Sequence, residues 1–116
     1  MFEIKDEVEQ AFREGYDKGI KDNLLEFSQD LRTIAEYYGF TSQANMLCEE
    51  SAEFTVALNK LRRGDQNAYK NVKEELADVL VIALQLRLLL GIQDIDNIMN
   101  EKVQRQLNRI KEGKQQ

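Results

Sequence analysis

Residues 47–61, with the sequence LCEESAEFTVALNKL, predict the fold of this chain. Apolar residues recur there at intervals of three and four, which is the period of an amphipathic α-helix. This apolar stripe consists of Leu47, Ser51, Phe54, Leu58 and Leu61. The same segment carries three glutamates within five residues, Glu49, Glu50 and Glu53. A helix that packs against a core does not need so dense a group of like charges, so the glutamates require a reason of their own.

The helical period continues on both sides of this segment. Residues 24–38, 72–90 and 95–103 carry similar apolar stripes, and none of them alternates with the period of two expected for a half-buried strand. Glycines follow three of the helical patterns as predicted helix ends: Gly39, Gly64 and Gly91. The chain contains no proline that would interrupt a helix. The sequence therefore predicts an all-α protein, an antiparallel bundle of four to five helices.

The predicted bundle forms one domain, which we place at residues 23–112. Residues 1–22 have a weaker apolar pattern, interrupted by Gly15 and Gly19, and we interpret them as a peripheral N-terminal helix or arm. Residues 113–116 are expected to be a frayed tail. The helix at residues 72–90 has apolar residues on more than one flank, and a chain of 116 residues offers little to cover them. We therefore expect the bundle to be completed by dimerisation.

Composition and charge exclude several classes of function. The net charge of −5 and the pI near 4.8 argue against a general nucleic-acid binder, which needs a basic surface. No apolar run approaches the roughly 20 residues of a membrane span, so we expect no membrane partner. The acidic start MFEIKDEVEQ is unlike a signal peptide, and a single cysteine, Cys48, fits a reducing compartment. A cytoplasmic location is the expectation.

The chain contains no histidine. This absence excludes the usual zinc sites, the Ser-His and Cys-His nucleophile pairs and histidine general bases. Any catalysis must therefore use carboxylates, basic side chains or a hard metal ion.

Two helices each place a carboxylate pair beside the apolar stripe. At about 100° per residue, Glu50 and Glu53 lie on the flank of the first stripe, whereas Glu49 points farther out. Glu75 and Asp78 repeat the i, i+3 spacing on the next helix. The short connection RRGDQN favours antiparallel packing of the two helices, which would bring the four carboxylates together.

Converging carboxylates need compensation. At an effective dielectric of about 20 and a separation of about 5 Å, each close pair repels by roughly 3 kcal/mol. Either a carboxyl group is protonated or a cation lies among them, and ligation by oxygen alone favours Mg²⁺, with Mn²⁺ as the alternative. The competing interpretation is an ordinary solvated helix face, because glutamate pairs are common on helix surfaces. A di-iron site would require Glu-x-x-His, which a chain without histidine cannot supply.

These segments resemble a known family. EESAE at residues 49–53, ELAD at 75–78 and NEKVQR at 100–105 are similar, in order, to motifs of the MazG-like all-α nucleoside triphosphate pyrophosphohydrolases, which include dimeric dUTPases. The likeness extends from about Asn23 to Arg109. It implies an enzyme that hydrolyses a nucleoside triphosphate to the monophosphate and pyrophosphate, in a homodimer or homotetramer.

The resemblance also implies roles for individual residues. Four acids would bind the metal: Glu50, Glu53, Glu75 and Asp78. Glu49 would be an outer neighbour of these ligands, and either Glu50, as first choice, or Glu53 would be the general base. Lys102 and Arg105 would contact the triphosphate, with Asn100 contacting substrate or a neighbouring helix. Aromatic residues that can stack on a base are Phe27, Tyr37, Tyr38 and Phe40.

The leading hypothesis is thus a Mg²⁺-dependent pyrophosphohydrolase that removes unwanted nucleotides. The alternative is a non-catalytic helical module for oligomerisation or regulation that has retained the acidic residues.

Overall fold

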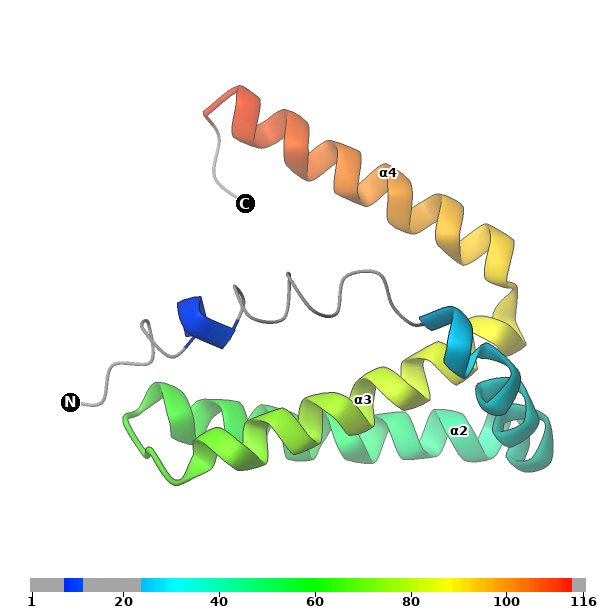
Figure 1. Cartoon of the computed structure of the whole chain (residues 1–116), viewed down its shortest axis with the longest axis horizontal. Coiled ribbons are helices and arrows are strands. Elements are labelled where there is room, and N and C mark those ends of the chain that lie inside the picture. Colours follow the sequence, from blue (N-terminus) through cyan, green and yellow to red (C-terminus); the bar gives the residue numbers. More distant parts are fainter. Residues whose placement is uncertain (1–7, 12–23, 114–116) are drawn as a thin grey trace.

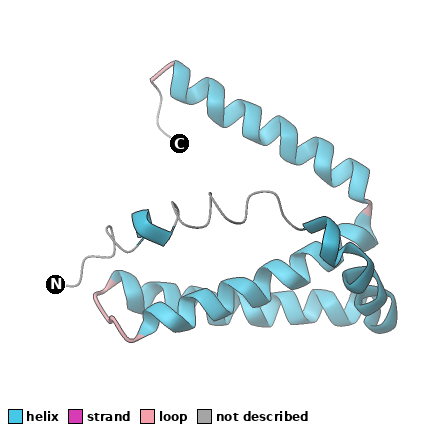
Figure 2. Ribbon diagram, in the orientation of Figure 1, coloured by secondary structure: helices cyan, strands magenta, loops and turns pink. Residues whose placement is uncertain are grey.

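The structure, a computed structural model of the whole chain, describes residues 8–11 and 24–113, with side chains from residue 29 in the second range. It contains three long helices, α2 (Leu24–Arg62), α3 (Ala68–Leu90) and α4 (Ile92–Lys111), and residues 8–11 are also helical. None of the described residues is in a strand (Figures 1 and 2). The all-α prediction is confirmed. Most of the predicted N-terminal arm and residues 114–116 of the predicted tail lie outside the described ranges.

A tight turn joins α2 to α3, and the two helices pack side by side in opposite directions (Figure 1). The turn needs glycine at residue 64, where φ is +100°, a left-handed value that other residues rarely adopt. Asp65 then holds the turn, because its carboxylate accepts a hydrogen bond of 3.0 Å from the backbone N–H of Asn67. The antiparallel arrangement expected from the RRGDQN connection is therefore present.

The contact face between α2 and α3 includes two of the glutamates. Its positions alternate in steps of four and three, as in packed helix pairs. They are residues 43, 47, 50, 54, 57 and 61 of α2 and residues 68, 72, 75, 79, 82 and 86 of α3, all buried or half-buried. Ala57 and Ala68 are among the most buried of these side chains, and their small size lets the two helix backbones approach closely.

The position of Glu50 differs from the wheel prediction, which placed it on the flank of the stripe. In the structure Glu50 belongs to the contact face, whereas Leu58, a member of the predicted apolar stripe, is 36% exposed. The reason is that α2 carries apolar residues around much of its circumference, including the exposed Met46 and Val56. The mean direction of the apolar side chains around the helix axis therefore does not identify the side of α2 that meets α3.

Gly39 divides α2 into two parts. Its backbone angles, φ +81° and ψ 172°, are not helical, so one helix ends at Gly39 as predicted and a second begins directly after it, with a kink between them. The part before the kink lies at an angle to the rest (Figure 1) and returns toward α3. Leu31 and Ile34 from this part line a small apolar pocket together with Val81 and Leu84 of α3.

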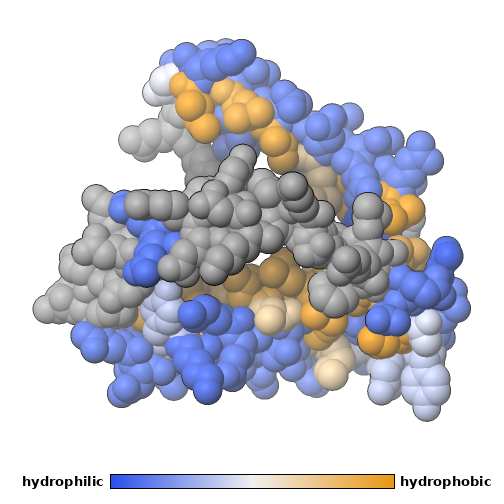
Figure 3. Space-filling view, viewed as in Figure 1, coloured by the Kyte–Doolittle hydropathy of each residue, from blue (hydrophilic) through white to orange (hydrophobic). Residues whose placement is uncertain are grey.

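Helix α4 leaves the pair at Gly91 and diverges from it (Figure 1). Its apolar residues gather on the side that faces the α2–α3 pair in Figure 3, yet they are between 47% and 70% exposed: Ile98, Met99, Val103, Leu107 and Ile110. The described helices thus form a packed pair with α4 attached at one end. Across residues 8–11 and 24–113, no helix is long and apolar enough to cross a membrane.

Candidate metal centre

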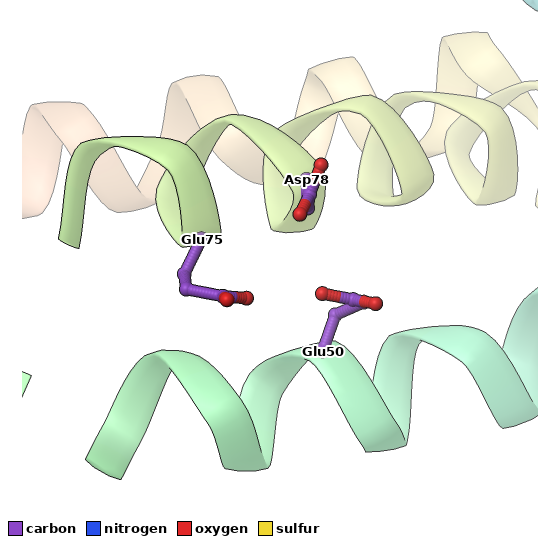
Figure 4. A group of neighbouring side chains, drawn as sticks. All are labelled: Glu50, Glu75 and Asp78. Carbon is purple, nitrogen blue, oxygen red and sulfur yellow. The ribbon is translucent and has the colours of Figure 1, made fainter. Parts of the chain in front are cut away.

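Glu50, Glu75 and Asp78 converge between α2 and α3, and we call these three residues the acidic layer. One carboxylate oxygen from each lies within 4.8 Å of the others. Figure 4 shows Glu50 extending from α2 toward Glu75 and Asp78, which extend from α3. Glu75 and Asp78 reach the same place because residues three apart lie on one face of a helix. The antiparallel packing then brings Glu50 opposite them.

Burial makes the acidic layer costly without a counterion. Glu50 and Glu75 are half-buried and Asp78 is exposed. The Oε2 atoms of Glu50 and Glu75 are buried, and neither has a hydrogen-bond partner among the described residues. Ionised carboxylates have no proton to donate to each other, so a buried oxygen in this layer requires a cation or a shared proton.

The pKa of Glu50 reports this environment. It is raised from 4.5 to about 7, first because burial penalises the charged form. The charge of Glu53, a hydrogen bond with Glu75 and the charges of Asp78 and Glu75 raise it further. That hydrogen bond exists when Glu50 carries the proton. Without a cation, Glu50 is therefore the group in this layer that holds a proton near neutral pH.

The structure separates the remaining predicted acids. Glu53 is exposed and lies outside the three-residue group, but it is close enough to raise the pKa of Glu50 by its charge. Glu49 is also exposed, and it is not a member of the group. Glu74, which is next to Glu75 in sequence, points away and lies 3.9 Å from Lys70 as an exposed ion pair.

The predicted phosphate-binding residues lie elsewhere in this chain. Lys102, Arg105 and Asn100 are exposed on α4, which diverges from the pair that carries the acidic layer (Figure 1). Among the predicted aromatic residues, Tyr38 lines a pocket near the layer. Tyr37 is 81% exposed and meets Tyr38 edge to face, with ring centroids 4.9 Å apart, and Phe40 is 52% exposed. The side chain of Phe27 lies outside the described part of the chain.

Two pockets flank the acidic layer. The first, which we call the Lys60 pocket, has a volume of about 350 Å³ and is lined by Ala52, Glu53, Val56, Ala57, Lys60, Asn71 and Glu75. It places one cationic side chain and one amide beside two of the carboxylates. The second, which we call the glutamine pocket, has a volume of about 260 Å³ and is lined by Ile34, Tyr38, Ser42, Gln43, Met46, Ile82 and Gln85.

The pockets and the acidic layer lie along one side of the helix pair. On α3 their residues follow steps of four and three, which is a single helix face: Asn71, Glu75, Asp78, Ile82 and Gln85. On α2 the corresponding face contains Met46, Glu50, Glu53, Ala57 and Lys60. A ligand bound along this side would meet the glutamine pocket, the carboxylates and the Lys60 pocket in that order.

The sequence analysis did not identify Lys60, Asn71, Gln43 or Gln85. The signal for Lys60 was its spacing of seven residues from Glu53, which places both on one side of a helix. Gln43 was recognisable because it continues the four-and-three alternation of the α2 contact face, where an apolar residue is expected. Gln85 had the same kind of signal as Lys60, because it lies seven residues after Asp78 and therefore on the same side of the helix.

The donor set of the acidic layer fits a hard divalent cation. Three carboxylates offer oxygen ligands alone, two of them have buried oxygens without a partner, and none of the three forms an ion pair with another described residue. Mg²⁺ and Mn²⁺ satisfy this chemistry, whereas zinc in proteins favours nitrogen and sulfur ligands. Comparison of the chain with protein-family models, with curated proteins and with solved structures finds no match.

Proposed function

We propose that this protein is a Mg²⁺-dependent nucleoside triphosphate pyrophosphohydrolase of the MazG-like type, acting in nucleotide-pool cleaning. The observation that carries the proposal is the acidic layer, in which Glu50, Glu75 and Asp78 converge and the two glutamates each have a buried oxygen without a partner. A carboxylate-bound Mg²⁺ ion in proteins usually works on phosphate oxygens. The order of the EESAE, ELAD and NEKVQR segments supports the same assignment.

Glu50, Glu75 and Asp78 would hold the metal, with Mn²⁺ as an alternative ion. Bound there, the metal would neutralise phosphate oxygens and lower the pKa of a water molecule. Glu49 would be a neighbour that does not ligate directly. Water attacks the α-phosphorus, the bond from that phosphorus to the bridging oxygen breaks, and pyrophosphate leaves.

A carboxylate must accept the proton of the attacking water. We assign this role to Glu53, because Glu50 belongs to the three-residue ligand group and Glu53 lies beside it in an open pocket. This order reverses the sequence-based preference for Glu50. The ligand role that the sequence also suggested for Glu53 is therefore not part of this assignment, although its charge acts on Glu50.

The triphosphate needs cationic partners. Within this chain the Lys60 pocket provides one, together with the amide of Asn71. Lys102, Arg105 and Asn100 would provide further contacts if α4 of a second copy lies over the site. The exposed apolar side of α4 supports such a homodimer, or a homotetramer, because a surface of this kind is usually covered by a partner.

The second candidate is a non-catalytic helical module for oligomerisation or regulation. The exposed apolar residues of α4 favour it, since they provide an interaction surface without any chemistry. Metal dependence distinguishes the two candidates, because a module of this kind requires no coupling between Mg²⁺ and the acidic layer.

Pyrophosphate release tests the proposal. A panel of canonical and modified nucleoside triphosphates is incubated with the protein in Mg²⁺ and in EDTA, and Glu53→Gln and Asp78→Asn are compared with the wild type. Release that requires the metal and falls by about 10²- to 10⁴-fold in the variants is expected. Glu74→Gln is the matched control, because Glu74 lies in the same helix and points away. Absence of release, with no Mg²⁺-induced rise in melting temperature, would favour the non-catalytic module.

A further inference from the structure

The glutamine pocket contains buried polar groups that the proposed hydrolysis does not use. Gln43 of α2 and Gln85 of α3 are 5% and 3% exposed, respectively. The Oε1 atom of Gln85 is buried and has no hydrogen-bond partner in the described part of the chain. Buried amides nearly always have a partner, and an orphaned one requires an explanation. A bound ligand that donates a hydrogen bond to Gln85 inside the pocket would supply the missing partner.

The size and lining of the pocket restrict which ligand can carry this hydrogen-bond donor. Its volume of about 260 Å³ is just below the range typical of drug-sized ligands, so it admits a small group. Apolar side chains from both helices, Ile34, Met46 and Ile82, form much of the wall, and Tyr38 adds an aromatic ring. Apolar walls with a few polar groups are the usual surroundings of a flat heterocyclic ring.

The pocket begins close to the acidic layer. Met46 precedes Glu50 by four residues on α2, and Ile82 follows Asp78 by four residues on α3. Four residues of helix span about 6 Å. Gln43 and Gln85 each lie seven residues from an acidic residue, which is about 11 Å along the helix. A pentose linking a phosphate at the acidic layer to a base at the glutamines would bridge this separation.

We propose that the glutamine pocket binds the nucleobase of the substrate and that Gln85 accepts a hydrogen bond from an N–H group of that base. The position of the phosphates in this proposal rests on the proposed function. The pocket then favours ligands that carry a nucleobase, because a ligand without a base leaves the Gln85 oxygen without a hydrogen-bond donor. The opposite end of the nucleotide, its β- and γ-phosphates, is directed toward the Lys60 pocket.

Binding without hydrolysis tests the pocket directly. The side-chain amide signals of Gln43 and Gln85 in ¹⁵N-labelled protein are assigned with the variants Gln43→Met and Gln85→Met. Cytidine, uridine, adenosine and guanosine monophosphates are then added separately, with ribose 5-phosphate as the ligand that lacks a base. At least one nucleotide is expected to shift the Gln85 signal, and ribose 5-phosphate is expected to leave it unchanged. If no nucleotide moves this signal, the proposal is wrong.

Affinity measurements separate hydrogen bonding from packing. Methionine preserves most of the volume of glutamine but has no amide, so Gln85→Met is expected to weaken nucleotide binding by about 10- to 100-fold. Its binding of ribose 5-phosphate should equal that of the wild type. Gln93→Met, at an exposed position of α4, is the control for the same exchange. If Gln85→Met does not fold, the Gln85 amide signal is assigned from through-bond correlations in the wild-type protein, and the wild-type titration still decides the outcome.

The two proposals fail in different ways. In one outcome, Gln85→Met hydrolyses a nucleoside triphosphate in preference to ribose 5-triphosphate as strongly as the wild type does. That result would overturn the pocket assignment and leave the proposed function intact. Nucleotide-induced shifts of Gln85 in a protein that hydrolyses no triphosphate would refute the function and support the pocket.

Discussion

Arg87 of α3 and Asp96 of α4 form a two-pronged ion pair across the Gly91 junction. The Nε atom of Arg87 donates to Oδ1 of Asp96 at 2.6 Å, and its Nη2 atom donates to Oδ2 at 2.7 Å. This planar geometry fixes direction as well as distance. The pair ties α4 to α3 beside a pocket that both helices line, so we expect it to help fix the angle at which α4 leaves.

Asp96→Asn is therefore expected to loosen α4 without unfolding the α2–α3 pair. Hydrogen exchange should accelerate in residues 92–100 and remain unchanged in α2. The pKa of Asp96 lies below its usual 3.8 because Arg87 donates to its carboxylate, so the pair contributes stability above pH 3.8 and loses it as the pH falls below that value. Asp94→Asn, in the same turn, serves as control, and equal effects of both variants would contradict the assigned role.

The raised pKa of Glu50 predicts how stability depends on pH. In EDTA, protonated Glu50 contributes stability that is fully present below its unfolded value of 4.5 and is lost as the pH rises through about 7. The free energy of unfolding, measured by urea denaturation, should thus fall over this interval. Glu50→Gln should flatten the profile, whereas Glu74→Gln should not. Saturating Mg²⁺ should reverse the trend, because the metal binds the ionised form.

Gly39 is predicted to be essential for the kink. Its angles, φ +81° and ψ 172°, belong to a region that is nearly restricted to glycine, although no atom lies within 4 Å of an added Cβ. Gly39→Ala should therefore cost about 1–3 kcal/mol of unfolding free energy through backbone strain alone. Gly113→Ala, with φ +74° and similar free space after α4, should change global stability little. Equal stability of wild type and Gly39→Ala in thermal denaturation would show that the kink is not required.

The Lys60 pocket predicts a specific kinetic defect. Lys60→Met should lower kcat/KM for a nucleoside triphosphate by about 10- to 100-fold, since a charge-assisted contact to phosphate is lost. Lys70→Met removes an exposed lysine whose ion pair with Glu74 lies on another side of α3, and its kinetics should match the wild type. If Lys102→Met impairs hydrolysis and Lys60→Met does not, the triphosphate is held by α4 instead.

The exposed apolar side of α4 predicts self-association. A sedimenting species of twice 13.5 kDa or more is expected at micromolar concentration. Val103→Glu should weaken association by about tenfold or more, because it would bury an unpaired charge. Gln104→Glu introduces the same charge at the adjacent position and should leave the oligomer intact. A monomeric wild-type protein would refute the prediction.

The sequence by itself determined the helices, their breaks and the identity of the acidic residues. These features depend on residues that are close together in the sequence. They are the spacing of apolar residues, the glycine at residue 64 and the i, i+3 spacing of Glu75 and Asp78. The short connection between α2 and α3 was likewise enough to predict their antiparallel packing.

Tertiary structure decided which side of α2 meets α3, and hence which acids meet. Glu50 joined Glu75 and Asp78 while Glu53 remained beside them, a division that a helix wheel with apolar residues on several sides could not make. The kink at Gly39 placed Tyr38 in the same pocket as Gln85, and the divergence of α4 kept Lys102 and Arg105 apart from the carboxylates. These relationships depend on which surfaces pack and how closely, because burial energy is a property of contacts between helices and not of any one segment.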